Sequence, residues 1–218
     1  MAAKFPLPNG SVLEIASVMA TAIAFTALTN AAPPVATAAN HTIANGDVLL
    51  VTSGWALIND RAVRAANVAA DTFALGGLNT TNTEKYTPGA GLGSVLPVES
   101  WAQISKVTGF TSAGGEQQYL TVGYLEDDDD RQFPTNRNPI TLTITVEDQP
   151  SAAYVDLVEE YGDTKALTVL RLKLPNGDQI IYPGFVSITS TPTMERNQLM
   201  TRTISVALSG RPTRYNAA

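Results

Sequence analysis

Short runs in which apolar and polar residues alternate make up most of the chain. In "TLTITVE" (residues 141–147) every second residue is apolar, and "LMTRTISVAL" (199–208) repeats the pattern. "TVLRLKL" (168–174) and "DQIIYPGFVSI" (178–188) flank Pro175-Asn176-Gly177, a sequence typical of a hairpin turn. Period-two runs bounded by Gly, Pro and Asn predict β-strands with one buried face. The chain is therefore predicted to be mainly β, a sandwich or barrel.

One segment has the period of a helix. In "PSAAYVDLVEEYG" (150–162) Pro150 suits a first turn and Gly162 a stop. Apolar residues recur at the i, i+3, i+4 and i+7 positions of one helical face, at Tyr154, Leu157, Val158 and Tyr161. We expect a single helix packed on the sheet.

Two other regions predict strands in different settings. Residues 38–78 contain three apolar runs separated by small residues and predict a compact β unit, followed by a Thr/Gly/Pro-rich stretch at 80–95. "ESWAQISKVTGF" (99–110) and "EQQYLTVGYL" (116–125) are predicted to pair with each other across a Gly-containing turn.

The amino-acid composition excludes several classes of protein and of functional site. Of 218 residues, 44% are hydrophobic and 16% charged, which suits a folded chain with contact surfaces and not a disordered tail. The net charge of -6 argues against tight binding to nucleic acid phosphates. Because cysteine is absent, thiolate metal sites and cysteine nucleophiles are excluded. A Ser-His-Asp triad would need His41, the only histidine, which lies in a turn-rich stretch.

An apolar segment near the start has two interpretations. "IASVMATAIAFTALT" (15–29) is followed by small residues, as in a secretory signal, but the preceding stretch has only Lys4 as a basic residue and Glu14 stands at its entry. The segment is too short to cross a bilayer. We favour two strands.

The sequence "GYLEDDDDRQFP" (123–134) holds five consecutive carboxylates. A calcium loop would need alternating carboxylates, a glycine at the sixth position and a glutamate at the twelfth. Counted from Asp127, the sixth residue is Gln132 and the twelfth is Asn138, so this pattern fails. A solvated loop is the common interpretation of such a run, and a contact with another copy of the chain is the alternative.

Charge along the chain bears on that choice. Residues 116–163 hold twelve acidic and two basic residues, whereas residues 164–218 hold seven basic and two acidic ones. An acidic middle and a basic end neutralise each other within one chain, or dock between copies in a head-to-tail interface. Charge alone does not decide between them.

Short motifs follow one another in a set order and spacing over roughly residues 98–214, including a Trp-led strand, an acidic tyrosine-leucine loop and a helix. The C-terminal motifs are Pro175-Asn176-Gly177, Pro183-Gly184-Phe185, Thr201-Arg202-Thr203 and Gly210-Arg211-Pro212. In the order and spacing of these motifs, the second half of the chain resembles the major tail tube protein of lambda-like, long-tailed phages.

This resemblance implies a fold, an assembly and a set of partners. The fold would be a tail-tube-type β-sandwich from residues 1–37 and 85–218, with one packed helix and a small inserted β module at 38–84. The module is expected to be a packing or decorative insertion, with host-surface binding as the alternative. The family forms stacked hexameric rings that enclose the tape-measure protein, join terminator and tail-tip proteins, and pass double-stranded DNA without binding it specifically. The chain would be a virion protein assembled in the host cytoplasm, without a cofactor, metal, membrane contact or enzymatic activity.

Candidate site residues follow from charge and from the strand faces. We expect 124–138 to be a long loop that becomes ordered on the adjacent ring, with an inter-ring contact formed by Tyr124, Leu125, Glu126, Asp127, Asp128, Asp129, Asp130, Arg131 and Phe133. The candidate basic partners are Arg202, Arg211 and Arg214, although Arg131 and Arg137 offer local pairing. Two hydroxyl rows are candidates for the lumen wall, or else ordinary solvent-facing or inter-subunit positions: Thr141, Thr143 and Thr145, and Thr201, Thr203 and Ser205.

Three other functions stay open at this point. A tail terminator or tip-adaptor subunit would share the fold. An exported adhesin or carbohydrate-binding β-sandwich would need the early apolar run to be cleaved. A hydrolase using Glu147 and Asp148 is disfavoured, because adjacent residues on a strand point to opposite faces.

Overall fold

The computed structural model describes residues 9–217, which form sixteen strands and one helix. The elements of the first half are β1 (Val12–Met19), β2 (Ile23–Phe25), β3 (Ala27–Leu28), β4 (Val35–Thr37), β5 (Val48–Ser53), β6 (Arg61–Ala66), β7 (Thr72–Leu75) and β8 (Gly93–Ile104). Those of the second half are β9 (Val107–Ala113), β10 (Gln117–Val122), β11 (Arg131–Arg137), β12 (Thr141–Glu147), α1 (Ala153–Thr164), β13 (Thr168–Lys173), β14 (Gln179–Ile188), β15 (Thr201–Leu208) and β16 (Thr213–Tyr215).

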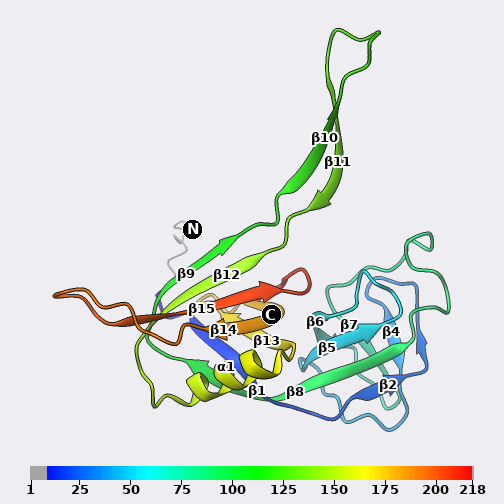
Figure 1. The fold of residues 1–218 in the computed structure, drawn as a ribbon. Helices are drawn as coiled ribbons and strands as arrows, with labels where there is room; N and C mark the ends of the chain where they lie inside the picture. Colours follow the sequence, from blue (N-terminus) through cyan, green and yellow to red (C-terminus); the bar gives the residue numbers. More distant parts are fainter. Residues whose placement is uncertain (1–8, 218) are drawn as a thin grey trace, which may run out of the picture.

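Fourteen strands join into one antiparallel sheet. Its order is β3-β4-β7-β6-β5-β8-β1-β13-β14-β15-β12-β9, with β2 paired to β8 and β16 paired to β14. The remaining two strands, β10 and β11, form a separate two-stranded sheet. The prediction of a mainly β fold with one packed helix is confirmed (Figure 1).

The body of the molecule is the part of the sheet with the spatial order β1-β13-β14-β15-β12-β9, and α1 packs on one of its faces. The alternating residues of β12 and β15 supply its core, since Ile144, Ile204 and Val206 are fully buried. Tyr154 and Val158 of α1 pack on the same cluster. The apolar rows predicted from the alternation are therefore the buried rows.

The ends of α1 differ from the prediction. The helix begins at Ala153, beyond Pro150, and runs past Gly162 to Thr164. Gly162 lies within the helix, where a Cβ would make an ordinary 3.4 Å contact with the carbonyl oxygen of Val186, so this glycine does not end the helix. The stop is Lys165, which adopts the left-handed conformation and donates its backbone N–H to Tyr161.

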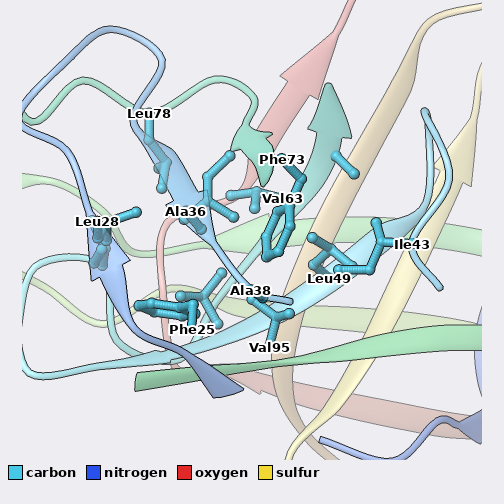
Figure 2. Close-up of a cluster of buried hydrophobic side chains, with 14 of the residues drawn as sticks. Phe25, Leu28, Ala36, Ala38, Ile43, Leu49, Val63, Phe73, Leu78 and Val95 are labelled. Carbon is cyan, nitrogen blue, oxygen red and sulfur yellow. The ribbon is translucent and has the colours of Figure 1, made fainter. Parts of the chain in front are cut away.

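The long strand β8 connects two hydrophobic cores. One end pairs with β1 and the other with β2 and β5. The first core surrounds Phe73 and includes Phe25, Leu28 and Ala36 from β2–β4, which pack with Leu49 and other residues of the following strands (Figure 2). A smaller cluster combines residues of both halves of the chain, including Leu50 and Ile181.

We call residues 23–95, which contain the first core, the small unit. It includes β2–β4 as well as the predicted module, and the boundaries at 38 and 84 stay a prediction. Residues 15–29 form the end of β1 followed by β2 and β3, in agreement with the two-strand interpretation.

The predicted pairing of 99–110 with 116–125 is wrong. β9 pairs with β12, and β10 pairs with β11. Gly114 and Gly115, both with positive φ, carry the chain from one ladder into the next. A Cβ on Gly114 would lie 1.9 Å from the carbonyl oxygen of Pro139, so only glycine fits where these two segments of the chain pass each other.

Candidate assembly surfaces

The most prominent surface feature is a β-hairpin that extends from the β9–β12 edge, formed by residues 116–138 and called the arm here (Figure 1). Hydrogen bonds between the backbones of Gly115, Glu116 and Asn138 continue the ladder from the body into the arm. All seven residues of β11 are exposed, and no residue of β10 is buried. A two-stranded hairpin without a core is marginally stable in water on its own, so the arm depends on its connection to the β9–β12 ladder.

The acidic run forms the tip of the arm. Arg131 pairs with Asp127 at 2.7 Å and its guanidinium lies 5.9 Å from the ring centre of Tyr124, so part of the predicted local pairing occurs. Within residues 9–217, none of the carboxylates of Glu126 and 128–130 forms an ion pair. The predicted loop over 124–138 is too long, because residues 131–137 form β11.

Large apolar side chains are also exposed on the arm. Leu125 is fully exposed at the tip, and Leu120 stands opposite Phe133 in the ladder. Tyr119 and Tyr124 are about half exposed. Contiguous apolar groups beside a strong charge are typical of a protein contact surface.

Two of the three candidate basic partners are occupied within the subunit. Arg202 is buried on the α1 side of the sheet, where it pairs with Glu159 at 3.0 Å. Arg214 pairs with Asp178, and this hydrogen bond is the largest cause of the lowered pKa of that carboxyl. Of the three candidates, Arg211 alone forms no ion pair among the described residues. The charge pattern of the sequence did not show which arginines are paired within the subunit. Arg202 lies on the buried strand face of Ile204, and its partner Glu159 comes from α1, so only the tertiary fold brings the two together.

The two hydroxyl rows lie on one face of the sheet. Thr143 stands opposite Ser205, and Thr145 stands opposite Thr203. Directly opposed residues point to the same side of an antiparallel pair, here the side away from α1. The rows continue onto β9 and β14, and we call this surface the hydroxyl face: Thr111, Thr141, Thr143, Thr145, Ser187, Thr201, Thr203 and Ser205.

The surroundings of His41 and of the acidic side chains bear on the catalytic and metal-binding sites considered from the sequence. The ring of His41 packs edge-to-face on Phe73 at 5.2 Å, and neither ring nitrogen has a hydrogen-bond partner. Glu147 pairs with Lys106 at 3.5 Å. In residues 9–217 no three His, Cys, Asp or Glu side chains are placed to hold a metal ion. Within that range, α1 is also too short and polar to span a bilayer.

Comparison with known proteins gives a family. A family model described as "Phage tail tube protein, TTP" matches residues 53–217. No curated protein matches the sequence. Among solved structures, the tube-terminating cap of the anti-feeding prophage is similar over 49% of this chain and 79% of its own, with a TM-score of 0.35 and 15% identity. A sheath/tube terminator of the PVC extracellular contractile injection system is similar over 50% and 90%, with a TM-score of 0.35 and 14% identity.

The family match spans far more than half of the chain, including the arm, part of the small unit and the body strands other than β1. It covers the acidic tip and every strand of the hydroxyl face. The chain therefore belongs to the phage tail tube protein family and is a structural component of a phage tail.

Proposed function

We propose that this protein polymerises as stacked hexameric rings and forms the tail tube of a lambda-like, long-tailed phage, through which DNA is ejected into the host. The observation that carries the proposal is the arm, an exposed hairpin with apolar side chains and unpaired carboxylates at its tip. Such a surface is incomplete in a solitary subunit. The role is structural, and it needs no catalytic residue, cofactor or metal.

Ring formation also uses the ends of the sheet. β9 and β3 are the outer strands of the sheet order. An exposed edge strand presents unpaired backbone groups that promote pairing with another chain. Pairing of edges around a ring covers these groups and produces a continuous barrel wall.

In this assembly the hydroxyl face lines the lumen. The hydroxyl rows carry short polar side chains, so they offer DNA few groups to bind, although the exposed Phe185 lies on the same face opposite Ala207. Thr141, Thr143 and Ser205 are exposed in the subunit, as a lumen wall requires. The lumen would hold the tape-measure protein before DNA passes, and the tube ends would join terminator and tail-tip proteins. The tube would assemble in the host cytoplasm and remain in the virion.

Electron microscopy of the purified protein at increasing concentration tests the assembly. We expect rings and then tubes. Single rings that never stack would indicate a terminator or tip adaptor, and monomers at every concentration and salt would refute the proposal.

Labelling tests the lumen assignment separately. Because the chain has no cysteine, Thr143→Cys introduces a unique thiol on the hydroxyl face, and Glu160→Cys is a matched control on exposed α1. In subunits both thiols should react with a large polymer-linked maleimide. In tubes the thiol at position 143 should become protected from that reagent while a small maleimide still reacts. Equal labelling of both sites in tubes would exclude the hydroxyl face from the lumen.

A further inference from the structure

A cleft of about 700 Å³ lies at the base of the arm. Three parts of the chain enclose it: residues 56–61 and 85–86 of the small unit, the returning chain of the arm at 137–140, and the link at 208–212 between β15 and β16. The cleft therefore lies between the small unit and the body.

The charged side chains that line this cleft are all basic. They are Arg61, Lys85, Arg137 and Arg211, and no aspartate or glutamate is among the lining residues. None of the four forms an ion pair within residues 9–217, whereas six other lysines and arginines do: Lys106, Arg131, Arg171, Lys173, Arg202 and Arg214. We call these four side chains and their surroundings the basic cleft.

Arg61 is partly buried, whereas Lys85, Arg137 and Arg211 are exposed. Its Nη2 donates to the hydroxyl of Thr213 at 3.2 Å, but its buried Nε has no hydrogen-bond partner. Burial is the main cause of a lowered pKa for Arg61. Tyr215 and then Tyr86 oppose this shift in part, and the positive charge of Arg211 is the smallest contribution that lowers the pKa. A partly buried guanidinium without a carboxylate is unfavourable, and an incoming anion offsets that cost.

The arm tip has the complementary surface. It carries five carboxylates, of which only Asp127 is paired, and the exposed Leu125. The basic cleft offers an exposed apolar partner in Leu57. The arm tip of a subunit does not reach the basic cleft of the same subunit. The cleft wall includes Gly115 at the arm base, and the six residues of β10, at about 3.3 Å each, already separate the tip from the base by about 20 Å.

We propose that the acidic arm tip of one copy docks in the basic cleft of another copy, with its carboxylates on the four bases and Leu125 beside Leu57. The contact is heterologous, since two different surfaces of one chain meet, and each copy keeps a tip and a cleft for the next. This inference rests on the proposed self-assembly and specifies which surface receives the arm. Of the three basic partners predicted for the acidic run, this inference keeps Arg211 and replaces Arg202 and Arg214 with the other bases of the cleft.

Charge reversal tests the contact without disturbing the core. Lys85→Glu/Arg211→Glu changes two exposed side chains that form no side-chain hydrogen bond or ion pair among the described residues. Lys165→Glu/Arg196→Glu is the matched control, with the same change in net charge at exposed bases outside the basic cleft. We expect the cleft variant to raise the assembly threshold by on the order of tenfold or more in sedimentation velocity at low salt, and the control to leave it near wild type. Equal thermal unfolding of both variants would show that the fold is intact.

Reversing the charges on both surfaces together provides the decisive test. Asp128→Lys/Asp129→Lys should weaken assembly as the cleft variant does, and a chain with all four reversals should assemble again. The inference is overturned if the cleft variant assembles like the control at every salt concentration, or if the combined variant fails while each pair alone is harmless. In either case wild-type tubes would leave the proposed function intact. A wild type that remains monomeric would overturn both. Retained assembly together with cleft-dependent binding of double-stranded DNA would assign the cleft to a different anion.

Discussion

Removing the hydroxyl of Tyr215 should loosen the small unit from the body. Tyr215 belongs to β16, which pairs with β14 of the body, yet its side chain contacts the small unit. Its hydroxyl accepts a hydrogen bond from the backbone N–H of Arg64 and donates one to the carbonyl of Gly76, both at 2.8 Å. The guanidinium of Arg64 lies 5.2 Å from the centre of the ring. One side chain thus links three segments that are far apart in sequence.

The size of the effect follows from these two bonds. Tyr215→Phe keeps the ring and its packing but deletes both hydrogen bonds. A typical intramolecular hydrogen bond contributes about 1 kcal/mol, and a buried group left without a partner costs about 1 to 3 kcal/mol. Because Gly76 and Arg64 also bond to each other through Gly76 N–H, only one polar group on each loses its partner. Both hydrogen bonds are only partly buried, so water offsets part of this cost, and we expect the free energy of unfolding to fall by about 2 to 4 kcal/mol.

Urea unfolding with hydrogen exchange measures this directly. Tyr119→Phe is the matched control, because Tyr119 lies on the exposed arm, where its hydroxyl forms no hydrogen bond with the described residues. The Arg64 amide should lose protection in Tyr215→Phe and keep it in the control. If the two variants have the same unfolding midpoint and the Arg64 amide stays protected, the hydroxyl does not hold the units together and the reasoning is wrong.

Three further predictions concern the body and its junctions. The pKa of Asp178 is lowered chiefly by Arg214, so its contribution to holding the C-terminal segment is complete above about pH 4 and is lost as the pH falls through the lowered value. Hydrogen-exchange protection at the C-terminus, taken relative to the intrinsic exchange rate at each pH, should therefore fall below pH 4 in wild type but depend less on pH in Asp178→Asn. Gly93→Ala should destabilise the chain by about 1 to 3 kcal/mol in urea unfolding, because the new Cβ would lie 1.9 Å from the carbonyl oxygen of Thr52. Ile144→Ala should cost about 2 to 5 kcal/mol by the same measurement, since Ile144 is fully buried.

The sequence predicted those strands whose burial alternates. Residues 141–147 and 201–208 place their apolar side chains under α1, so period-two patterning and burial have the same cause. The turn at 175–177 joins β13 to β14 as expected. These features are local consequences of one buried face, and local sequence is sufficient to predict them.

The hairpin of the arm was not predicted from hydrophobic patterning, because no residue of β10 or β11 is buried. "RQFPTNR" has no apolar alternation and contains Pro134, so β11 carries no periodic signal. Its strand conformation comes from the ladder that continues past Gly114 and Gly115. The basic cleft was missed for a related reason, since its four bases come from segments that only the tertiary fold brings together.

The small unit gains a mechanical role if the basic cleft is the docking site. It contributes Arg61 and Lys85, half of the charged lining, so the cleft exists only while this unit is held against the body. Tyr215 and the Arg61–Thr213 hydrogen bond provide that hold from the C-terminal strand. Tyr215→Phe should then weaken assembly even at temperatures where the chain is fully folded, because the cleft walls separate more readily. A unit that served only to bind a host surface would predict unchanged assembly in that variant.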